Sequence, residues 1–548
     1  MARIIVTSAL PYVYSVPHLG NFVGSVLPAD VYFKYLKMKG DDAIFICGSD
    51  QHGTPVELAA IKKGVEPEKL ADELHTTVKA LFEKYHCTFT YYGKTHTEEN
   101  REVTYGVFNE LYNNGYLLER EDMQAYCNID KRFLTDRFIQ GTCPYCHKRS
   151  ARGDQCDNCG RLLEPTQIID PFCAICGKSD ITFKKTKNLA FELNKLQGEL
   201  KEFIKKNGKH NWSKDAVNKS LSMIKEGLKP RDITRNMKWG FPVPLAGYEN
   251  YVIYVWFDAP LGYIGITKEW DSKKWRDYWQ NEHTQLVQFL GKDNTTFHTI
   301  FWPAELIGSR LGFVLPYTIK ESQFLVSKTL KFSKSQGVGL NMRTALEILG
   351  ADYWRFALMY MYPESADSEF TEHGLVEIVN TVMNDKIGNL AQRVLKLSKS
   401  NKFLAEGDVL AADNANVKKA VKEYGDAFDK LHLKKAIGTV VRLADIGNGI
   451  MSRKEPWILA KKAKDDEKAE KQAKRIFVEL LEITYAMGIL LYPFSPKASG
   501  ELLSYFGVRS APTLKMLEDK VRPDLEKEPK PIFQKMTNSE IEKLKKYA

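Results

Sequence analysis

Residues 3–27 read RIIVTSALPYVYSVPHLGNFVGSVL. The β-branched run at its start is typical of a buried parallel strand, and a turn containing Pro11 and Pro17 follows it. Apolar residues then recur at the spacing of a helix, at Leu19, Phe22, Val23, Val26 and Leu27. A second strand is predicted at 43–47 (AIFIC). This strand–helix–strand order predicts an α/β fold with a doubly wound, Rossmann-type parallel sheet, whose ligands bind at the carboxyl ends of the strands.

A long insertion interrupts the strand–helix pattern of the sequence. Between about 118 and 232 the chain carries most of its cysteines and a lysine-rich helical segment around 189–228. The strand pattern resumes at 251–256 (YVIYVW) and 284–290 (TQLVQFL). Beyond about 376 the apolar residues keep helical spacing, which predicts an all-α bundle to about 530. One nucleotide-binding fold is therefore split by an insertion and followed by helices.

Composition narrows the class of protein. The 548 residues include 79 Lys and Arg against 69 Asp and Glu, a net charge of +10, which fits a polyanionic partner. The first residues carry no long apolar segment after a basic start, and no apolar run approaches the length of a membrane span, so we expect neither a signal peptide nor a transmembrane helix. Clustered cysteines in such a chain favour metal binding in a reducing cytoplasm over disulfides.

Two short segments have residues suited to phosphate. His18, Gly20 and Asn21 lie where a helix begins, and a helix N-terminus offers N–H groups and partial positive charge to a triphosphate. Far downstream, Lys331, Ser333 and Lys334 lie in a glycine-flanked segment, KFSKSQGVG. Two lysines with hydroxyls suit electrostatic stabilisation of a pyrophosphate. Each segment alone is weak evidence; the pair on either side of a split α/β fold is far more specific.

The cysteines of the insertion have the spacing of zinc knuckles. Two short C-x-x-C pairs predict one closed, tetrahedral zinc site formed by Cys143, Cys146, Cys156 and Cys159. A further pair, Cys173 and Cys176, needs partners. Cys127 lies upstream, with Asp130 three residues further on. The sequence leaves two alternatives open: a second zinc held by Cys127, Cys173 and Cys176, completed by Asp130, or an empty, degenerate second knuckle.

The HLGN and KFSKS pair resembles the two signature motifs of class I aminoacyl-tRNA synthetases, with Asn21 in place of the second histidine and Phe332 in place of methionine. The flanking segments ALPY (9–12), FICGSDQHGT (45–54), WFDAPLGY (256–263), GKDN (291–294) and FHTIFWP (297–303) resemble methionyl-tRNA synthetases over nearly the whole chain.

This resemblance implies particular residues for each substrate. Catalysis would involve His18, Asn21, Lys331 and Lys334. ATP would contact His18, Gly20, Asn21, Lys331, Ser333 and Lys334. Asp50 would hold the ammonium group of methionine. The methionine pocket would be lined by Leu10, Tyr12, Trp256, Ala259, Pro260, Tyr263 and His298. An aromatic, conformable pocket suits an unbranched thioether. Asn294 departs from the apolar residue that some members have there, which predicts a more polar wall or a side chain turned away.

The resemblance also implies a reaction and partners. Methionine would attack the α-phosphate of Mg²⁺-bound ATP to give methionyl-adenylate, and the acyl group would pass to the 3′-terminal adenosine of tRNA(Met). Asn389, Arg393 and Trp457 would recognise the anticodon, since loop bases are recognised by stacking and edge hydrogen bonds. Members with a dimerising C-terminal appendix extend further than this chain, so we expect a cytoplasmic monomer that contains structural zinc.

Six segments are expected on this basis. They are 1–117, first half of the catalytic fold; 118–232, connective insertion with zinc knuckles; 233–322, second half; 323–375, KFSKS loop and stem-contact region; 376–530, α-helical anticodon-binding domain; and 531–548, a C-terminal peptide packing back on the core. The alternatives are another class I synthetase, for leucine, isoleucine, valine or cysteine, and a non-enzymatic zinc protein that binds RNA. The first three would carry a larger editing insertion, and the cysteine enzyme a metal in its active site.

Overall fold

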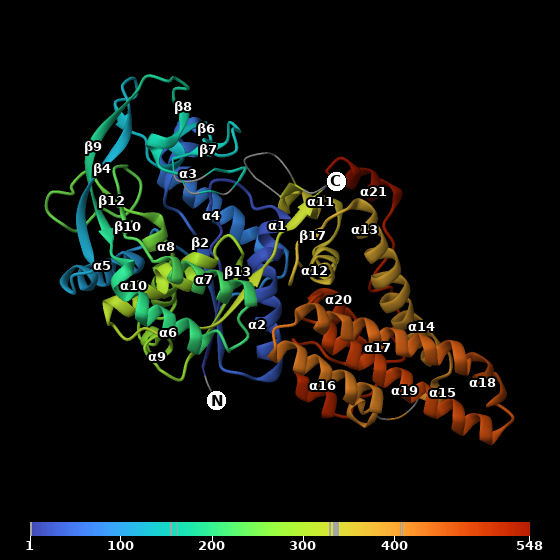
Figure 1. The fold of residues 1–548 in the computed structure, drawn as a ribbon. Helices are drawn as coiled ribbons and strands as arrows, with labels where there is room; N and C mark the ends of the chain where they lie inside the picture. The colour runs from blue at the N-terminus through green and yellow to red at the C-terminus, as the bar shows by residue number, and fades with distance from the viewer. Residues whose placement is uncertain are drawn as a thin grey trace.

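The computed structural model describes residues 3–153, 156–159, 161, 163–327, 330–331, 339–405, 407 and 409–547, with the backbone alone at 330–331. A five-stranded parallel sheet lies at its centre (Figure 1). Its order is β14 (Pro316–Ser322), β13 (Gln285–Gly291), β1 (Ile4–Ser8), β2 (Ala43–Ser49) and β3 (Tyr91–Lys94). Strand β1 pairs with β2 on one side and with β13 on the other. The two halves of the chain thus meet at β1, which confirms the split, doubly wound fold.

Both faces of the sheet are covered, which explains the uninterrupted apolar run of β1. Val6 belongs to one hydrophobic core and Ile5 to the other, as alternation along a strand requires. Helices α2 (Leu27–Lys39) and α8 (Val255–Trp270) pack directly on the strands of the sheet. The two cores also include residues of α3 (Thr54–Lys63), α4 (Pro67–Lys84), α5 (Glu98–Asn113), α9 (Trp275–Trp279) and α10 (Trp302–Ser309). Helix α1 (Leu19–Asn21) continues through a π-helical turn, η1 (Phe22–Val26), into α2.

The strand predicted at 251–256 is wrong in extent and in place. Strand β12 covers Val252–Ile253, pairs with β11 (Thr234–Arg235) and lies outside the central sheet. Helix α8 already begins at Val255, so Val255 and Trp256 are helical. A short aromatic and β-branched run does not distinguish a strand from a buried helix, and α8 is buried along most of its length. The strand predicted at 284–290 is present as β13.

The insertion is built on a long antiparallel ribbon. Strand β4 (Leu117–Cys127) pairs with β9 (Ile181–Phe191) along its whole length. Beside it lies a small sheet next to the cysteine clusters, with β6 (Ile139–Thr142) between β7 (Ala151–Arg152) and β8 (Ile169–Cys173) (Figure 1). Strands β5 (Arg132–Phe133) and β10 (Arg231–Asp232) extend the ribbon's sheet. The predicted helical segment around 189–228 is two helices, α6 (Gln197–Asn207) and α7 (Lys214–Glu226).

A small three-stranded sheet and two helices follow β14. The strands are β16 (Leu330–Lys331), β15 (Leu325–Ser327) and β17 (Ser368–Glu369), and the helices are α11 (Met342–Ile348) and α12 (Ala351–Tyr360). Helix α13 (Glu372–Glu377) then continues through a π-helical stretch, η6 (Ile378–Gly388), into α14 (Asn389–Ser400). This long helical run leads from the catalytic part into the bundle (Figure 1).

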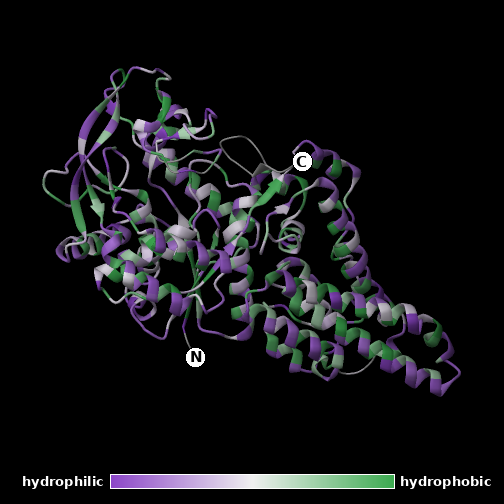
Figure 2. Cartoon of the chain, in the orientation of Figure 1, coloured by the Kyte–Doolittle hydropathy of each residue, from purple (hydrophilic) through white to green (hydrophobic). Residues whose placement is uncertain are grey.

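The C-terminal part is helical. Its helices are α15 (Lys402–Ala405), α16 (Ala415–Asp429), α17 (Leu433–Lys454), α18 (Pro456–Lys462), α19 (Glu467–Leu491) and α20 (Pro496–Leu503). Apolar and polar residues alternate around them (Figure 2), as amphipathic packing requires. The last helix, α21 (Asn538–Lys545), returns to α11 and α13, and the Tyr353 hydroxyl accepts a hydrogen bond from the Gln534 backbone. None of the helices in the described residues has the length and apolar character needed to cross a membrane.

A buried charge cluster joins the bundle to the catalytic part. Arg355 of α12 pairs with Asp30 of α2 at 2.7 Å, and the same carboxylate binds Lys34 at 2.6 Å. The Arg355 guanidinium also donates to the carbonyl oxygens of Tyr85 and of Pro493, the latter just beyond α19. Since all three charged side chains are buried, loss of one partner would leave an uncompensated charge. These bonds fix the bundle against the sheet.

Candidate active site and metal clusters

The chain just beyond the KFSKS segment meets the HLGN segment through backbone hydrogen bonds. The Leu19 N–H donates to the Leu340 carbonyl at 3.0 Å, and the Met342 N–H donates to the Pro17 carbonyl at 2.9 Å. Upstream, Lys331 pairs with Val326 in the small sheet. Residues 332–338, including the predicted Ser333 and Lys334, lie outside the described residues, as does the Lys331 side chain. The residues on either side of this segment are thus anchored, one at the small sheet and one at the HLGN helix.

His18 is the N-cap residue of α1, and His18 and Asn21 each accept a hydrogen bond from the backbone N–H of the other. The Asn21 N–H donates to His18 Nδ1 at 3.0 Å, and the His18 N–H donates to Asn21 Oδ1 at 3.3 Å. This is a reciprocal capping box, so Asn21 has a structural reason to be there. Because Nδ1 accepts a hydrogen bond, the hydrogen of the neutral imidazole lies on Nε2, where it can be donated to a phosphate oxygen.

One large cavity, of about 2060 Å³, collects the predicted substrate residues. Those lining it are Leu10, Tyr12, His18, Gly20, Asn21, Asp50, Trp256, Ala259, Pro260, Tyr263 and His298. They come from the ends of β1 and β2, from the start of α1, from α8 and from the π-helical turn η5 (Phe297–Phe301). The cavity therefore lies at the carboxyl edge of the parallel strands, where such folds bind ligands.

Tyr12 and Asp50 are held side by side by extensions of β1 and β2. The Asp50 N–H donates to the Pro11 carbonyl at 2.9 Å, and the Val13 N–H donates to the Asp50 carbonyl at 3.1 Å. The Asp50 side chain is buried, and its Oδ1 has no hydrogen-bond partner among the described residues. Burial, and then the nearby Asp258, raise the pKa of Asp50 well above its usual value. A bound cation would reverse this shift, because an opposite charge favours the carboxylate.

Tyr263 and His298 form one wall of the cavity, where they are hydrogen-bonded to each other. His298 Nδ1 lies 3.0 Å from the Asn294 carbonyl and donates to it, so Nε2 accepts the Tyr263 hydroxyl hydrogen at 2.9 Å. Burial lowers the pKa of His298 to about 4, so the ring is neutral near pH 7. Trp256 stacks on Phe297, with ring centroids 3.7 Å apart. Asn294 also lines the cavity, so this wall is more polar than hydrocarbon side chains would make it.

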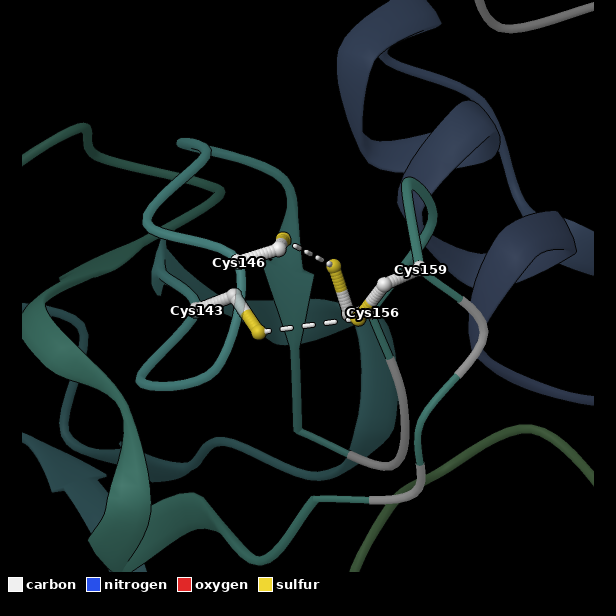
Figure 3. A group of neighbouring side chains, drawn as sticks. All are labelled: Cys143, Cys146, Cys156 and Cys159. Carbon is white, nitrogen blue, oxygen red and sulfur yellow. Dashed lines mark hydrogen bonds between the residues drawn. The ribbon is translucent and has the colours of Figure 1, made fainter.

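Each cysteine cluster brings four candidate metal ligands close together. The Sγ atoms of Cys143 and Cys159 are 3.9 Å apart, and those of Cys146 and Cys156 are 3.7 Å apart (Figure 3). Four sulfurs bound tetrahedrally to zinc at about 2.3 Å would be about 3.8 Å apart. Disulfide sulfurs would be about 2 Å apart. The first cluster thus fits a zinc ion in size and chemistry.

The second cluster has three sulfurs and one carboxylate. Cys127 Sγ lies 3.7 Å from Cys176 Sγ, and Cys173 Sγ lies 2.9 Å from Asp130 Oδ2. All four ligand atoms lie within 4.8 Å of one another, so either cluster could hold a metal ion. Asp130 is therefore placed as a fourth ligand, although its carboxylate is a harder ligand than a thiolate.

Comparisons with known proteins give the family. The sequence model described as "tRNA synthetases class I (M)" matches residues 4–395, and that described as "Anticodon binding domain of methionyl tRNA ligase" matches residues 404–547. The methionine--tRNA ligase of Ignicoccus hospitalis is 42% identical over 99% of this chain and 97% of its own length. The chain belongs to the methionyl-tRNA synthetase family.

A second relative and a solved structure agree. The methionine--tRNA ligase of Caldivirga maquilingensis is 39% identical over 98% of this chain and 92% of its own length. Mycobacterium tuberculosis methionyl-tRNA synthetase in complex with methionyl-adenylate aligns with a TM-score of 0.78, over 97% of this chain and 100% of that chain, at 22% identity. The structural match shows a shared fold. Membership of the methionyl family excludes the other class I synthetases and the non-enzymatic zinc protein considered from the sequence.

The predicted anticodon residues of this synthetase come together at one end of the bundle. Glu455 has a left-handed backbone (φ 41°), which turns the chain between α17 and α18 and places Trp457 in the first turn of α18. The Arg393 guanidinium carbon lies 5.8 Å from the centre of the Trp457 ring. Asn389 lies one turn before Arg393 on α14 and donates to the Asp385 carboxylate at 3.3 Å. Arg393 is exposed and Trp457 is half-buried.

Two residues at the cavity, Arg235 and Gly53, were not predicted from the sequence of this synthetase. Arg235 lines the cavity, binds both Asp136 oxygens at 3.3 Å and lies over the Tyr254 ring. Among 79 basic residues, charge alone does not single it out. Glycine is required at Gly53, since φ is +94° and a Cβ would lie 2.7 Å from the Tyr12 hydroxyl oxygen.

The buried His52 links Asp258 of α8 to His96 beside the cavity. His52 Nδ1 donates to Asp258 Oδ2 at 2.6 Å, and its Nε2 lies 2.8 Å from His96 Nδ1. Burial, and then His52, lower the pKa of His96 to about 4, so His96 is neutral near pH 7. The only sequence signal for this network is that His52 and Asp258 occur inside the two segments that resemble the family.

Proposed function

We propose that this chain ligates methionine to tRNA(Met) in two steps. The methionine carboxylate oxygen attacks the α-phosphorus of ATP, which is bound as its Mg²⁺ complex, and pyrophosphate leaves. A hydroxyl oxygen of the tRNA's terminal ribose then attacks the acyl carbon, and AMP leaves. The observation that carries the proposal is the cavity shared by eight predicted methionine residues and the HLGN segment, in a chain of this family.

The protein's part in this reaction is positioning and charge stabilisation. Asp50 supplies an anionic partner to the substrate ammonium, and Tyr263 with His298 bounds the side-chain pocket. His18 Nε2 and the helix that begins at Leu19 face the phosphates with donors and partial positive charge. Lys331 and Lys334 neutralise charge on the departing pyrophosphate. Asn389, Arg393 and Trp457 bind the anticodon bases.

The test is methionine-dependent exchange of pyrophosphate into ATP, followed by aminoacylation of a tRNA(Met) transcript. Methionine is expected to drive exchange far better than leucine, isoleucine, valine or cysteine. A transcript with an altered CAU anticodon is expected to be a much poorer acceptor. Exchange driven equally by another of these amino acids would contradict the proposed substrate, and full charging of the altered transcript would contradict anticodon binding. Oligomeric state stays a prediction, checked by light scattering.

The proposal includes two structural zinc ions, one per cluster. Both would stabilise the tip of the insertion without chemistry at the active site. Elemental analysis should give two equivalents for the wild type and one for Cys146→Ser. Cys176→Ser should also give one, while Cys47→Ser, at a buried cysteine outside both clusters, should keep two. One equivalent in the wild type, unchanged by Cys176→Ser, would mean that the Cys127 cluster is an empty knuckle.

A further inference from the structure

The insertion contributes part of the wall of the substrate cavity. Leu134, Thr135, Asp136 and Arg137 line the cavity, and they run from the end of β5 into a short 3₁₀ turn, η2 (Asp136–Phe138). Most of the predicted substrate residues lie instead at the ends of the central strands and on α8. The shape of the site therefore depends on how this part of the insertion is held against the sheet.

Helix α3 is the surface on which this part of the insertion packs. The helix begins at Thr54, shortly after Asp50, and Thr54 itself lines the cavity. Leu58 of α3 packs against the hydrophobic core of the insertion, to which Leu134 and Phe138 belong. Helix α3 thus lies between the loop that carries Asp50 and the cavity wall formed by the insertion.

A buried ion pair joins α3 to the insertion. Arg132 Nη2 donates to Glu57 Oε1 at 2.5 Å, and the Glu57 side chain is 5% exposed. The guanidinium carbon of Arg132 lies 4.5 Å from the centre of the Phe138 ring, in the turn that lines the cavity. Arg132 Nε is buried and has no hydrogen-bond partner among the residues that the structure describes. Loss of Glu57 would therefore leave the charge of Arg132 uncompensated.

The same carboxylate is connected to the loop that carries Asp50. Glu57 Oε2 accepts a hydrogen bond from the Trp239 N–H at 3.4 Å, and Trp239 Nε1 donates to the Gln51 carbonyl at 2.5 Å. Gln51 directly follows Asp50 in the sequence. Glu57 therefore connects three segments that are far apart in sequence: the loop after β2, the insertion, and the start of the second half of the catalytic fold.

We propose that Glu57 is a positioning residue, which holds the cavity wall formed by the insertion against the loop after β2 through its ion pair with Arg132. The inference rests on the proposed activation of methionine and deepens it. A misplacement of about 1 Å at an active site can cost about 10²-fold in rate. Removing one partner of a buried ion pair is strongly destabilising, whereas replacing both by apolar residues of similar volume is often neutral. Single and double substitutions should therefore have different effects.

The experiment measures kcat and KM in methionine-dependent pyrophosphate exchange. Glu57→Gln and Arg132→Met should each lower kcat about ten- to hundredfold. KM for methionine should stay within about threefold of the wild type, because Asp50 and His298 are held by other elements. The double variant Glu57→Met, Arg132→Met should restore kcat to within about threefold of the wild type.

Glu364→Gln is the matched control. The Glu364 carboxylate pairs with Lys320 of β14 at 3.1 Å and accepts a hydrogen bond from the Leu433 N–H of α17 at 2.8 Å. Like Glu57, it is a largely buried acid that binds one cation and one backbone N–H, but it joins β14 to the bundle. Glu364→Gln should unfold at a lower denaturant concentration than the wild type and keep the wild-type kcat.

Every other outcome decides against the positioning role. Wild-type kcat in Glu57→Gln, or a double variant that loses as much as the two single variants combined, would overturn the proposal. An equal loss of kcat in Glu364→Gln would overturn it too, since general destabilisation would then explain both. Should Glu57→Gln fail to fold, Arg132→Met, at a side chain that is 23% exposed, is compared with the double variant in the same way. Absence of methionine-dependent exchange in the folded wild type would instead contradict the proposed function.

Discussion

The proposed methionine pocket and the proposed anticodon surface of this synthetase differ in how their side chains are held. In the pocket, Tyr263, His298 and the Asn294 carbonyl are bonded to one another before any ligand arrives. At the bundle tip, Arg393 is exposed and lies loosely over a half-buried Trp457. The pocket thus consists of fixed, desolvated groups, whose loss is costly. The proposed anticodon surface instead has exposed side chains, which RNA bases would order on binding. Mutations should therefore have larger effects in the pocket and separable effects at the tip.

The largest effect is expected at Asp50. Asp50→Asn keeps the size of the side chain and removes the charge that pairs with the substrate ammonium. Truncating a buried charge pair costs about 2–5 kcal/mol, so kcat/KM for methionine in exchange should fall by a factor of about 30 to about 5000. KM for ATP should change little. A loss below about threefold, or an equal rise in KM for ATP, would remove Asp50 from the ammonium site.

A large effect is also expected when His298 titrates. Its pKa is lowered from 6.5 to about 4, so between these values the unfolded chain binds a proton that the folded chain does not. The contribution of neutral His298 is present above pH 6.5 and is lost as the pH falls toward 4, by about 3 kcal/mol in all. Denaturant unfolding at several pH values should show this decrease.

Two glutamine variants test this assignment, one at His298 and a matched control at an exposed histidine. His298→Gln should make the decrease between pH 6.5 and 4 smaller without removing it, because the pKa of His96 is lowered in the same way. His283→Gln, at a ring that is 82% exposed, should leave it as in the wild type. Parallel curves for the wild type and His298→Gln would contradict the burial of a neutral ring and weaken the contrast with the exposed tip.

An intermediate effect is expected at Trp457. Stacking of a base on an aromatic ring contributes about 1–3 kcal/mol, so Trp457→Ala should lower kcat/KM for tRNA(Met) in aminoacylation by a factor of about 5 to about 150. Pyrophosphate exchange should be unaffected, since the pocket is intact. Ile458→Ala, at the exposed neighbouring side chain, serves as the control and should charge tRNA normally. Equal losses in both assays would indicate misfolding and not a lost contact.

The smallest effect is expected at Arg393. Arg393→Lys keeps the charge and loses the planar group that lies over Trp457, so aminoacylation should fall about two- to fivefold. Lys396→Arg, on the same helix, should change it less than Arg393→Lys does. If Arg393→Lys lowers aminoacylation as much as Trp457→Ala or more, the surface at Arg393 and Trp457 depends on fixed geometry as the pocket does. The contrast between the two regions is then lost.

The sequence predicted long, regular features better than contacts made by the fold. The run around Ile5 and Val6 identified a buried parallel strand because both faces of the sheet demand apolar residues. The segment 251–256 misled because short apolar runs suit a strand and a buried helix equally. Arg235 was missed because it is one charged residue among many. Only the folded chain brings this residue of β11 to the cavity.

The backbone bonds between Leu19 and Leu340 and between Pro17 and Met342 have a consequence for synthesis on the ribosome. The partners are about 320 residues apart in sequence, so this contact is highly non-local. A nascent chain that has emerged only as far as the insertion already contains His18 and Asp50, yet β13 and the 339–342 segment are still to come. Such a chain lacks both the strand that pairs with β1 and the segment that bonds to Pro17 and Leu19, so this edge of the cavity is completed only after residue 342 has been synthesised.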